Sequence, residues 1–234
     1  MNDELNAANE VAKAVTEVAK TTSKAIDASK EFGSFLKPFI DCTLEQAIGI
    51  VEDKFKYARW KNQVRLMEKA HEYLRDKNLT EPSRIIPLKL AVPLLQAASI
   101  EDDNYLQDLW AKLLTNFANK DSGVDLQRSY IDILKRMNPL EVIILKKIYD
   151  LPYEEAKNNK LSTRDLPNDI VCYSQGYKSL DEKALNPEVE LALANLARQG
   201  CISPAMVMSG GLVYTSIYQT YLGKCFYDAC TLTK

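Results

Sequence analysis

"SIEDDNYLQDLWAKLLTNF", residues 99–117, places three consecutive acids directly before a run of large apolar residues. Behind the acids, apolar side chains recur at steps of three and four, which is typical of one face of an amphipathic helix: Leu106, Leu109, Trp110, Leu113, Leu114 and Phe117. We predict that Ser99 caps this helix. Asp102, three residues later, would then face the free amides and the positive end of the helix dipole. On this interpretation the acids have a structural role.

The same carboxylates, Glu101, Asp102 and Asp103, also support an alternative in which the protein is a metal-dependent enzyme such as a nuclease. Tight metal sites need converging ligands, commonly including histidine or distant carboxylates. The chain has one histidine, His71, and Arg75 stands where an H-E-x-x-H zinc motif needs its second histidine. We therefore favour the capping role and expect no metal, no cofactor and no catalytic residue.

Upstream of the acids, the sequence indicates two long helices. Residues 7–36 carry a seam of mostly small side chains at the alternating spacing of a coiled coil, from Val11 to Leu36. A second helix starts behind a capping box at Thr43 and runs to about residue 78. We predict a long helical hairpin over residues 1–78. A helical core segment over residues 79–137 should pack with it, and Pro87 and Pro93 should delay or kink its first helix.

One pair on the second helix is a candidate interaction site. Arg59 and Trp60 are adjacent, and Trp60 lies on a different helix face from seam positions such as Ile48 and Phe55. An exposed tryptophan beside an arginine can anchor an interface. The alternative is that Trp60 packs into the core of its own domain.

Downstream, residues 138–234 change in character. Asn138-Pro139 and Asn186-Pro187 each have the pattern of a helix start, and residues 152–184 are interpreted as a loop with short pieces. Residues 201–218 indicate strand, turn and strand around "SGG", and a last helix follows Thr220. We predict a mainly α fold, with a long N-terminal helical hairpin and helical bundle followed by a small winged-helix-like α+β unit.

Charge argues against nucleic acid as a partner of this last unit. The net charge is −2, and the helix that would read a DNA groove carries Glu188 and Glu190 at its N-terminal end. Residues 201–218 contain no lysine or arginine. We therefore interpret the hairpin as a protein-contact or packing module.

Five cysteines without a C-x-x-C pair indicate reduced thiols in a cytoplasmic protein.

Several stretches together resemble the bacterial abortive infection alpha family. The most specific is "LLQAASIEDDNYLQDLWAKLL", with Glu101, Asp102, Leu109, Trp110, Ala111 and Leu114 in the expected pattern. Near the C-terminus, Leu222, Gly223 and Phe226 agree with an L-G-x-x-F pattern that is generic to winged helices. The resemblance implies a role in defence against bacteriophage, in which infected cells stop growing or die before the phage matures. It brings no catalytic residues.

The leading hypothesis is that the protein acts without catalysis, by forming a homo-oligomer or by binding protein partners. One alternative is a membrane-acting effector in which the amphipathic segment 7–36 makes a peripheral contact with a bilayer. Against that alternative, acids in the segment balance its lysines, and its apolar face holds mostly small residues.

Overall fold

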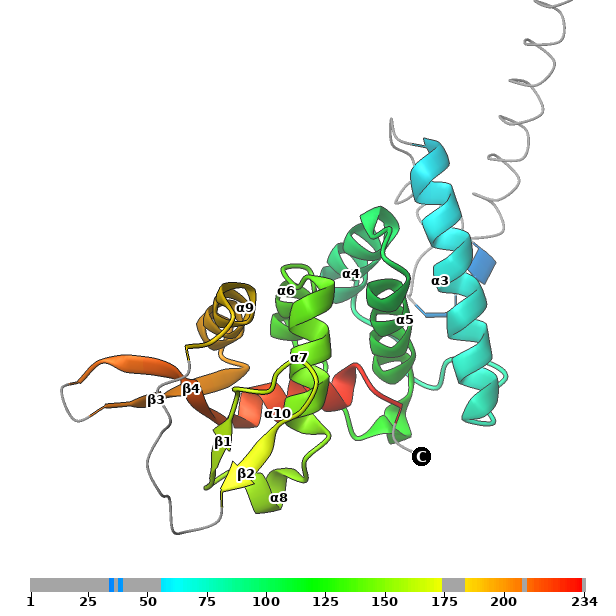
Figure 1. Cartoon of the computed structure of the whole chain (residues 1–234). Coiled ribbons are helices and arrows are strands. Elements are labelled where there is room, and N and C mark those ends of the chain that lie inside the picture. The colour runs from blue at the N-terminus through cyan, green and yellow to red at the C-terminus, as the bar shows by residue number, and fades with distance from the viewer. Residues whose placement is uncertain (1–33, 36–37, 40–55, 174–183, 208–209, 233–234) are drawn as a thin grey trace, which may run out of the picture. The chain divides into compact units, whose positions relative to one another are not determined.

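The computed structural model describes residues 34–35, 38–39, 56–173, 184–207 and 210–232 (Figure 1). The chain divides into two compact units, Met1–Asp102 and Asp103–Lys234. α-Helices dominate the described residues, and a small antiparallel sheet lies in the second unit, so the fold is α+β with a large excess of helix. The predicted coiled-coil seam and most of the predicted hairpin over residues 1–78 lie outside the described residues.

The first unit contains two described helices, α3 (Lys56–Asp76) and α4 (Leu88–Ile100), which pack against each other. Leu66 on α3 and Leu94 on α4 are both fully buried. Two polar bonds join α3 to the end of α4 and the residues after it: Asn62 Nδ2 donates to the Ser99 carbonyl at 3.2 Å, and an Arg65 guanidinium nitrogen donates to the Asp102 carbonyl at 3.3 Å.

Both prolines of the "TEPSRIIPLKLAVPLL" stretch belong to the structure of α4. The helix begins directly after Pro87, whose carbonyl accepts from the amides of Leu90 and Ala91, so the predicted late start is confirmed. Pro93 lies inside the helix, which continues to Ile100. This proline is the sixth residue of α4 and does not end the helix, which is short and largely buried.

The second unit is built around α5 (Asn104–Ala118), α7 (Pro139–Tyr149) and α10 (Tyr221–Ala229), which pack on one another. In chain order, the short helices η1 (Lys120–Ser122) and α6 (Arg128–Leu134) lie between α5 and α7, and α8 (Tyr153–Ala156) and α9 (Pro187–Arg198) lie between α7 and α10. Trp110, Phe117 and Phe226 are almost completely buried in this core. The apolar face predicted behind the acids is therefore a core face.

The helix starts predicted in this unit are confirmed. Asn138 accepts from the amide of Glu141 at 2.9 Å, and Glu141 bonds the Asn138 amide in return, which closes a capping box. Asn186 caps α9, and Thr220 caps α10 by accepting from the Gly223 amide at 3.0 Å. Proline fills the first helical position of α7 and α9, where no amide donor is needed.

Within the described part of the chain, the sheet has four antiparallel strands in the order β2-β1-β4-β3. The strands are β1 (Lys160–Ser162), β2 (Val171–Tyr173), β3 (Ile202–Met206) and β4 (Leu212–Gln219). The predicted strand, turn and strand over residues 201–218 is confirmed as β3 and β4. Strands β1 and β2 lie where we expected loop, and the fully buried Leu161 of β1 pairs with Ile217 of β4.

Candidate interaction surface

The acidic triplet is a helix start, but its cap is one residue later than predicted. One oxygen of the Asp103 carboxylate accepts from the amides of Tyr105 at 2.8 Å and Leu106 at 2.9 Å, and α5 begins at Asn104. Ser99 is buried inside α4, and its hydroxyl donates back to the Gln96 carbonyl at 2.8 Å. The prediction of Ser99 and Asp102 as the cap is therefore wrong, because the preceding helix runs through Ser99.

Neither Asp102 nor His71 lies in a metal-binding arrangement within the described residues. Asp102 is exposed, and its backbone carbonyl, not its carboxylate, accepts the bond from Arg65. Within the residues that the structure describes, no group of three or more histidine, cysteine, aspartate or glutamate side chains is arranged to hold a metal ion. His71 is exposed on α3, with its ring edge-on to Phe35 at a centroid distance of 4.8 Å.

The candidate pair Arg59 and Trp60 lies in the first turns of α3. Arg59 is half-buried, and for Trp60 the structure describes only the backbone. Its role as an interface anchor stays a prediction. Segment 7–36, proposed for membrane contact, lies outside the described residues except for 34–35.

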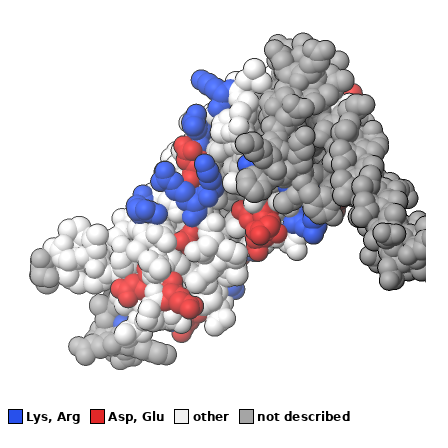
Figure 2. All heavy atoms as spheres, turned by 90° about the horizontal axis from the view of Figure 1, so that it is seen from above, with Lys and Arg blue, Asp and Glu red and all other residues white. Residues whose placement is uncertain are grey.

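The end of the β3–β4 hairpin is apolar and exposed. Met206 is 68% exposed and Leu212 58% exposed, and Val207 also faces solvent. We call these three residues the apolar hairpin surface. In Figure 1 the hairpin extends past the helices of its unit, and its end in Figure 2 shows neither blue nor red spheres on the visible face. Large exposed apolar side chains grouped at one place are typical of a surface that meets a partner.

The backbone of the hairpin explains how these side chains come to be exposed. The register shifts between Pro204 and Ala205, so that Ala205 is buried while its neighbour Met206 is exposed. The Val207 amide donates to the Gly211 carbonyl at 2.9 Å and closes the turn. Gly210 has φ of 87°, a left-handed conformation that glycine adopts without strain. The predicted turn at "SGG" is confirmed at its two glycines.

Buried hydrogen bonds fix the base of the hairpin to α7. The Tyr149 hydroxyl donates to the Cys201 carbonyl at 2.6 Å and accepts from the Thr220 amide at 3.0 Å. Gln219 Nε2 donates to the Ile148 carbonyl at 2.5 Å. Burial raises the pKa of Tyr149 from 10.0 to about 12, so its hydroxyl keeps its proton as a donor at alkaline pH where a free tyrosine ionises. The hairpin therefore has a firmly held base and an exposed apolar end.

The charged residues of the second unit lie outside the β3–β4 hairpin. Glu188 and Glu190 are exposed in the first turn of α9, as predicted, while Leu191 beside them is 65% exposed. No residue from Gln199 to Gly223 is charged, which extends the uncharged stretch beyond both strands of the hairpin. The lack of charge could be predicted from the sequence, but the exposure of Met206 and Leu212 could not, since alternation alone assigns these residues to no particular face.

A helix-rich α+β protein with an exposed, uncharged β-hairpin is the class that the fold and this surface define. The family model for abortive infection alpha matches residues 61–230, which is well over half of the chain. The chain belongs to the abortive infection alpha family, and membership implies a role in defence against bacteriophage. No curated protein and no solved structure matches the chain. Among the described helices, none combines the length and the apolarity needed to cross a bilayer.

Proposed function

We propose that this phage-defence protein acts through protein contacts rather than by catalysing a reaction, and that the apolar hairpin surface makes one of these contacts. The observation that carries the proposal is the exposure of Met206 and Leu212 on a hairpin without charged residues. An interface core is depleted in charge and enriched in methionine and other large apolar side chains. The partner is another protein or a second copy of the chain.

The anchoring of the hairpin supports this proposal. Binding is favoured when the contacting side chains are already held in place, because less conformational entropy is lost. Tyr149 and Gln219 bond the strand ends to α7 through buried contacts, so the hairpin is presented in one orientation. Asp103, the best-placed carboxylate of the alternative enzyme site, is engaged by two amides of α5.

We also infer that residues 138–234 form a winged-helix-like unit in which the β3–β4 hairpin is the wing. The order of α7, β1, α9, β3, β4 and α10 supports this inference. So does the packing of α9 against α7 and against the hairpin strands. Exposed Glu188 and Glu190 at the start of α9 would repel phosphate, which favours protein as the partner of this unit over nucleic acid.

The test is charge insertion on the apolar hairpin surface. Met206→Lys and Leu212→Lys should weaken partner binding about tenfold or more, since a buried apolar contact is replaced by an unpaired charge. Full-length protein would be captured from infected and uninfected cells, its mass measured by light scattering, and protection scored by phage plating. We expect both variants to lose the captured partner or the oligomer, and to lose protection.

Leu191→Lys is the matched control, because Leu191 is as exposed as Met206 but lies on α9. It should retain protection and partner. Circular dichroism would show that all three variants remain folded. Full protection by both hairpin variants, with a monomeric protein and no captured partner for the wild type, would refute the proposal.

A further inference from the structure

A small pocket lies inside the second unit, between α5, α7 and α10. Its volume is about 120 Å³. The floor is apolar and formed by Leu109, Val142, Leu145, Phe226 and Cys230. We call it the three-helix pocket. It is separate from the apolar hairpin surface and from the acidic triplet, and the inference does not rest on the proposed function.

The floor favours an uncharged, apolar group. Phe226 is completely buried, and Leu109, Val142 and Leu145 are nearly so. Burial raises the pKa of the Cys230 thiol well above its usual range, so the sulfur is neutral at physiological pH. Apolar cavities of this kind exclude ordered water and accept small hydrocarbons: a cavity of about 150 Å³ holds one benzene ring. The three-helix pocket is somewhat smaller than that cavity, so it takes at most a single ring or a short chain whose polar end stays at the mouth.

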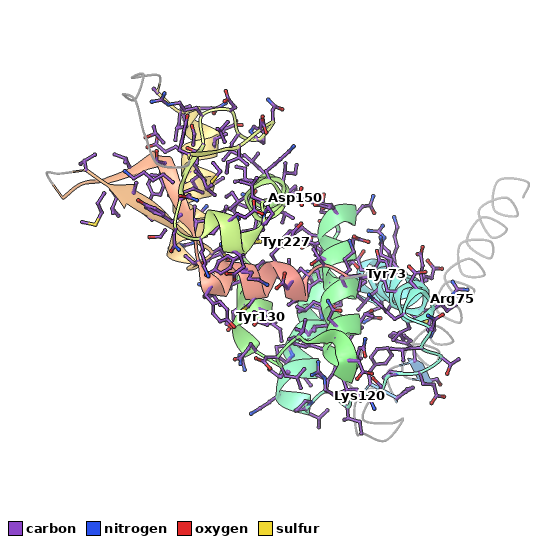
Figure 3. The ribbon with its side chains drawn as sticks, turned by 90° about the horizontal axis from the view of Figure 1, so that it is seen from below. Tyr73, Arg75, Lys120, Tyr130, Asp150 and Tyr227 are labelled. Atoms are coloured by element: carbon purple, nitrogen blue, oxygen red, sulfur yellow. The ribbon has the colours of Figure 1, made fainter. Side chains whose placement is uncertain are left out.

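The mouth of the pocket is polar and carries two ammonium groups, Lys112 on α5 and Lys146 on α7. Each is paired with a carboxylate one helical turn away, at 2.7 Å from Asp108 and 2.7 Å from Asp150 respectively. The Tyr227 hydroxyl from α10 donates to the same Asp150 at 2.7 Å. Asp150 and Tyr227 are labelled in Figure 3, where they lie next to each other.

These groups can recognise the polar end of a ligand. An ammonium has three donors, and Lys146 directs two bonds to the oxygens of Asp150. The carboxylate of a ligand at the mouth can accept a further bond from Lys146, while the apolar part of the same ligand fills the floor of the pocket. Such charge-assisted bonds are about twice as strong as neutral ones. Predominantly apolar pockets with a few convergent polar groups are typical of small-molecule sites.

We propose that the three-helix pocket binds a small carboxylic acid whose apolar part is one aromatic ring or a chain of comparable size. The ring lies on Phe226, Leu109 and Leu145. The carboxylate lies at Lys146. Phe226 belongs to α10 and Cys230 caps its C-terminal end, and α10 follows the hairpin directly, so an occupied pocket stabilises the element that closes the hairpin base.

The experiment is a titration of the full chain, carrying ¹³C-labelled leucine and valine methyl groups, with benzoate, benzyl alcohol and benzylamine. We expect saturable shifts of the methyl signals of Leu109, Val142 and Leu145. Benzoate should bind about tenfold more tightly than benzyl alcohol, which corresponds to one charge-assisted bond, and benzylamine should bind most weakly.

Two variants locate the ligand. Val142→Phe fills the pocket and should weaken all three probes at least about tenfold. Lys146→Met removes the ammonium group at the mouth together with its ion pair to Asp150, and it should remove most of the preference for benzoate while leaving benzyl alcohol unchanged. Lys135→Met is the control: Lys135 is an exposed lysine after α6, outside the pocket, and all three affinities should match the wild type.

The outcomes are distinguishable even if Val142→Phe fails to fold, because Lys146→Met retains the whole apolar core. Shifts that do not saturate, or that lie away from the three floor residues, would overturn the proposal. Equal binding of benzoate and benzyl alcohol, unaffected by Lys146→Met, would overturn its carboxylate specificity.

Discussion

Asp103 is the residue that decides whether the acidic triplet is a cap or a chemical site. Its carboxylate holds two amides of α5, so Asp103→Ala should lower the free energy of unfolding by about 1 kcal/mol. Asp103→Asn keeps an acceptor oxygen and should cost less than about 0.5 kcal/mol. Urea unfolding followed by circular dichroism measures both values.

The same two variants discriminate against the enzyme alternative. A carboxylate that acts as an acid or base, or that supplies the negative charge of a catalytic metal site, loses this function as asparagine, whereas an N-cap keeps its acceptor oxygen. Cells that carry Asp103→Asn should therefore keep their protection in a phage plating assay. Lost protection with unchanged stability would contradict the capping role and favour chemistry at Glu101, Asp102 and Asp103.

Gly223 is required by a close approach of two chain segments. A Cβ atom built at this position would stand 2.0 Å from the Tyr149 hydroxyl and 2.1 Å from the Cys201 carbonyl, both part of the hairpin base. A backbone carbonyl cannot move away as a flexible side chain can. Gly223→Ala should therefore lower the free energy of unfolding by about 3 kcal/mol.

Gly211→Ala provides the comparison within the same hairpin. Among the described residues, its added Cβ would meet the Val207 side chain, at 3.3 Å, and a side chain can adjust. We expect a cost below about 1 kcal/mol. Chemical denaturation of both variants would show the difference, and equal stability of Gly223→Ala and the wild type would contradict the packing described here. The glycine of the L-G-x-x-F pattern thus has a physical reason in this chain.

At the scale of elements, the side chain of Asn116 on α5 binds the C-terminal end of α10. Asn116 Nδ2 lies within hydrogen-bond distance of the carbonyls of Ala229, the last residue of α10, at 2.9 Å and of Thr231, two residues later, at 2.8 Å. The last carbonyls of a helix have no partner within the helix, and buried ones need another donor. Asn116→Ala should cost about 2 kcal/mol and speed hydrogen exchange in α10.

Asn104→Ala is the control for this prediction, because Asn104 is on the same helix but exposed at its first position. Its effect should stay within about 0.5 kcal/mol. Hydrogen exchange followed by mass spectrometry separates the two variants. Unchanged protection of α10 in Asn116→Ala would show that apolar packing alone holds this helix.

Elements with strong local signals could be predicted from the sequence. Asn138, Asn186 and Thr220 each cap a helix as expected, because a capping side chain bonds to amides only two or three residues away. Strands β1 and β2 could not be predicted. Each has three residues, and the burial of Leu161 depends on pairing with the distant Ile217, which local propensity does not encode.

The cap of α5 shows how a local signal can mislead. Ser99 has the chemistry of an N-cap, but its hydroxyl bonds back to Gln96 inside α4, an alternative that serine has in a helix. The helix break falls at Glu101, whose backbone is extended, and the cap moves to Asp103.

For the candidate surface, composition indicated an uncharged hairpin. Only the register shift at Pro204 and Ala205 determines that Met206 is exposed.

At the scale of the whole molecule, several buried acids of the second unit predict sensitivity to alkali. Burial raises the pKa of the Cys201 thiol from 9.0 to about 12. It also raises the pKa of Tyr149 and Tyr130 from 10.0 to about 12 each. In all three the neutral form is the one that the folded protein holds, and Tyr149 uses its proton to bond the hairpin base.

The sign of the effect follows from proton linkage. Between about pH 9 and pH 12 the unfolded chain loses these protons while the folded protein keeps them, so the free energy of unfolding falls as pH rises. Below the unfolded pKa values the contribution is fully present. Stability should therefore show no loss from these groups between pH 7 and about pH 8.5 and should decline steeply above pH 9. Urea unfolding at a series of pH values measures this curve.

Absorbance of tyrosinate at alkaline pH tests the cause of the decline. Because Tyr149 and Tyr130 titrate only near pH 12 while folded, their tyrosinate signal should rise together with the loss of circular dichroism, not before it. Tyr149→Phe removes one of the linked protons and should flatten the slope above pH 9, although its lost hydrogen bonds lower stability at every pH. Full ionisation of all tyrosines while the protein is still folded would show that the core around α7 admits water, and would contradict the anchoring of the hairpin on which the interaction surface depends.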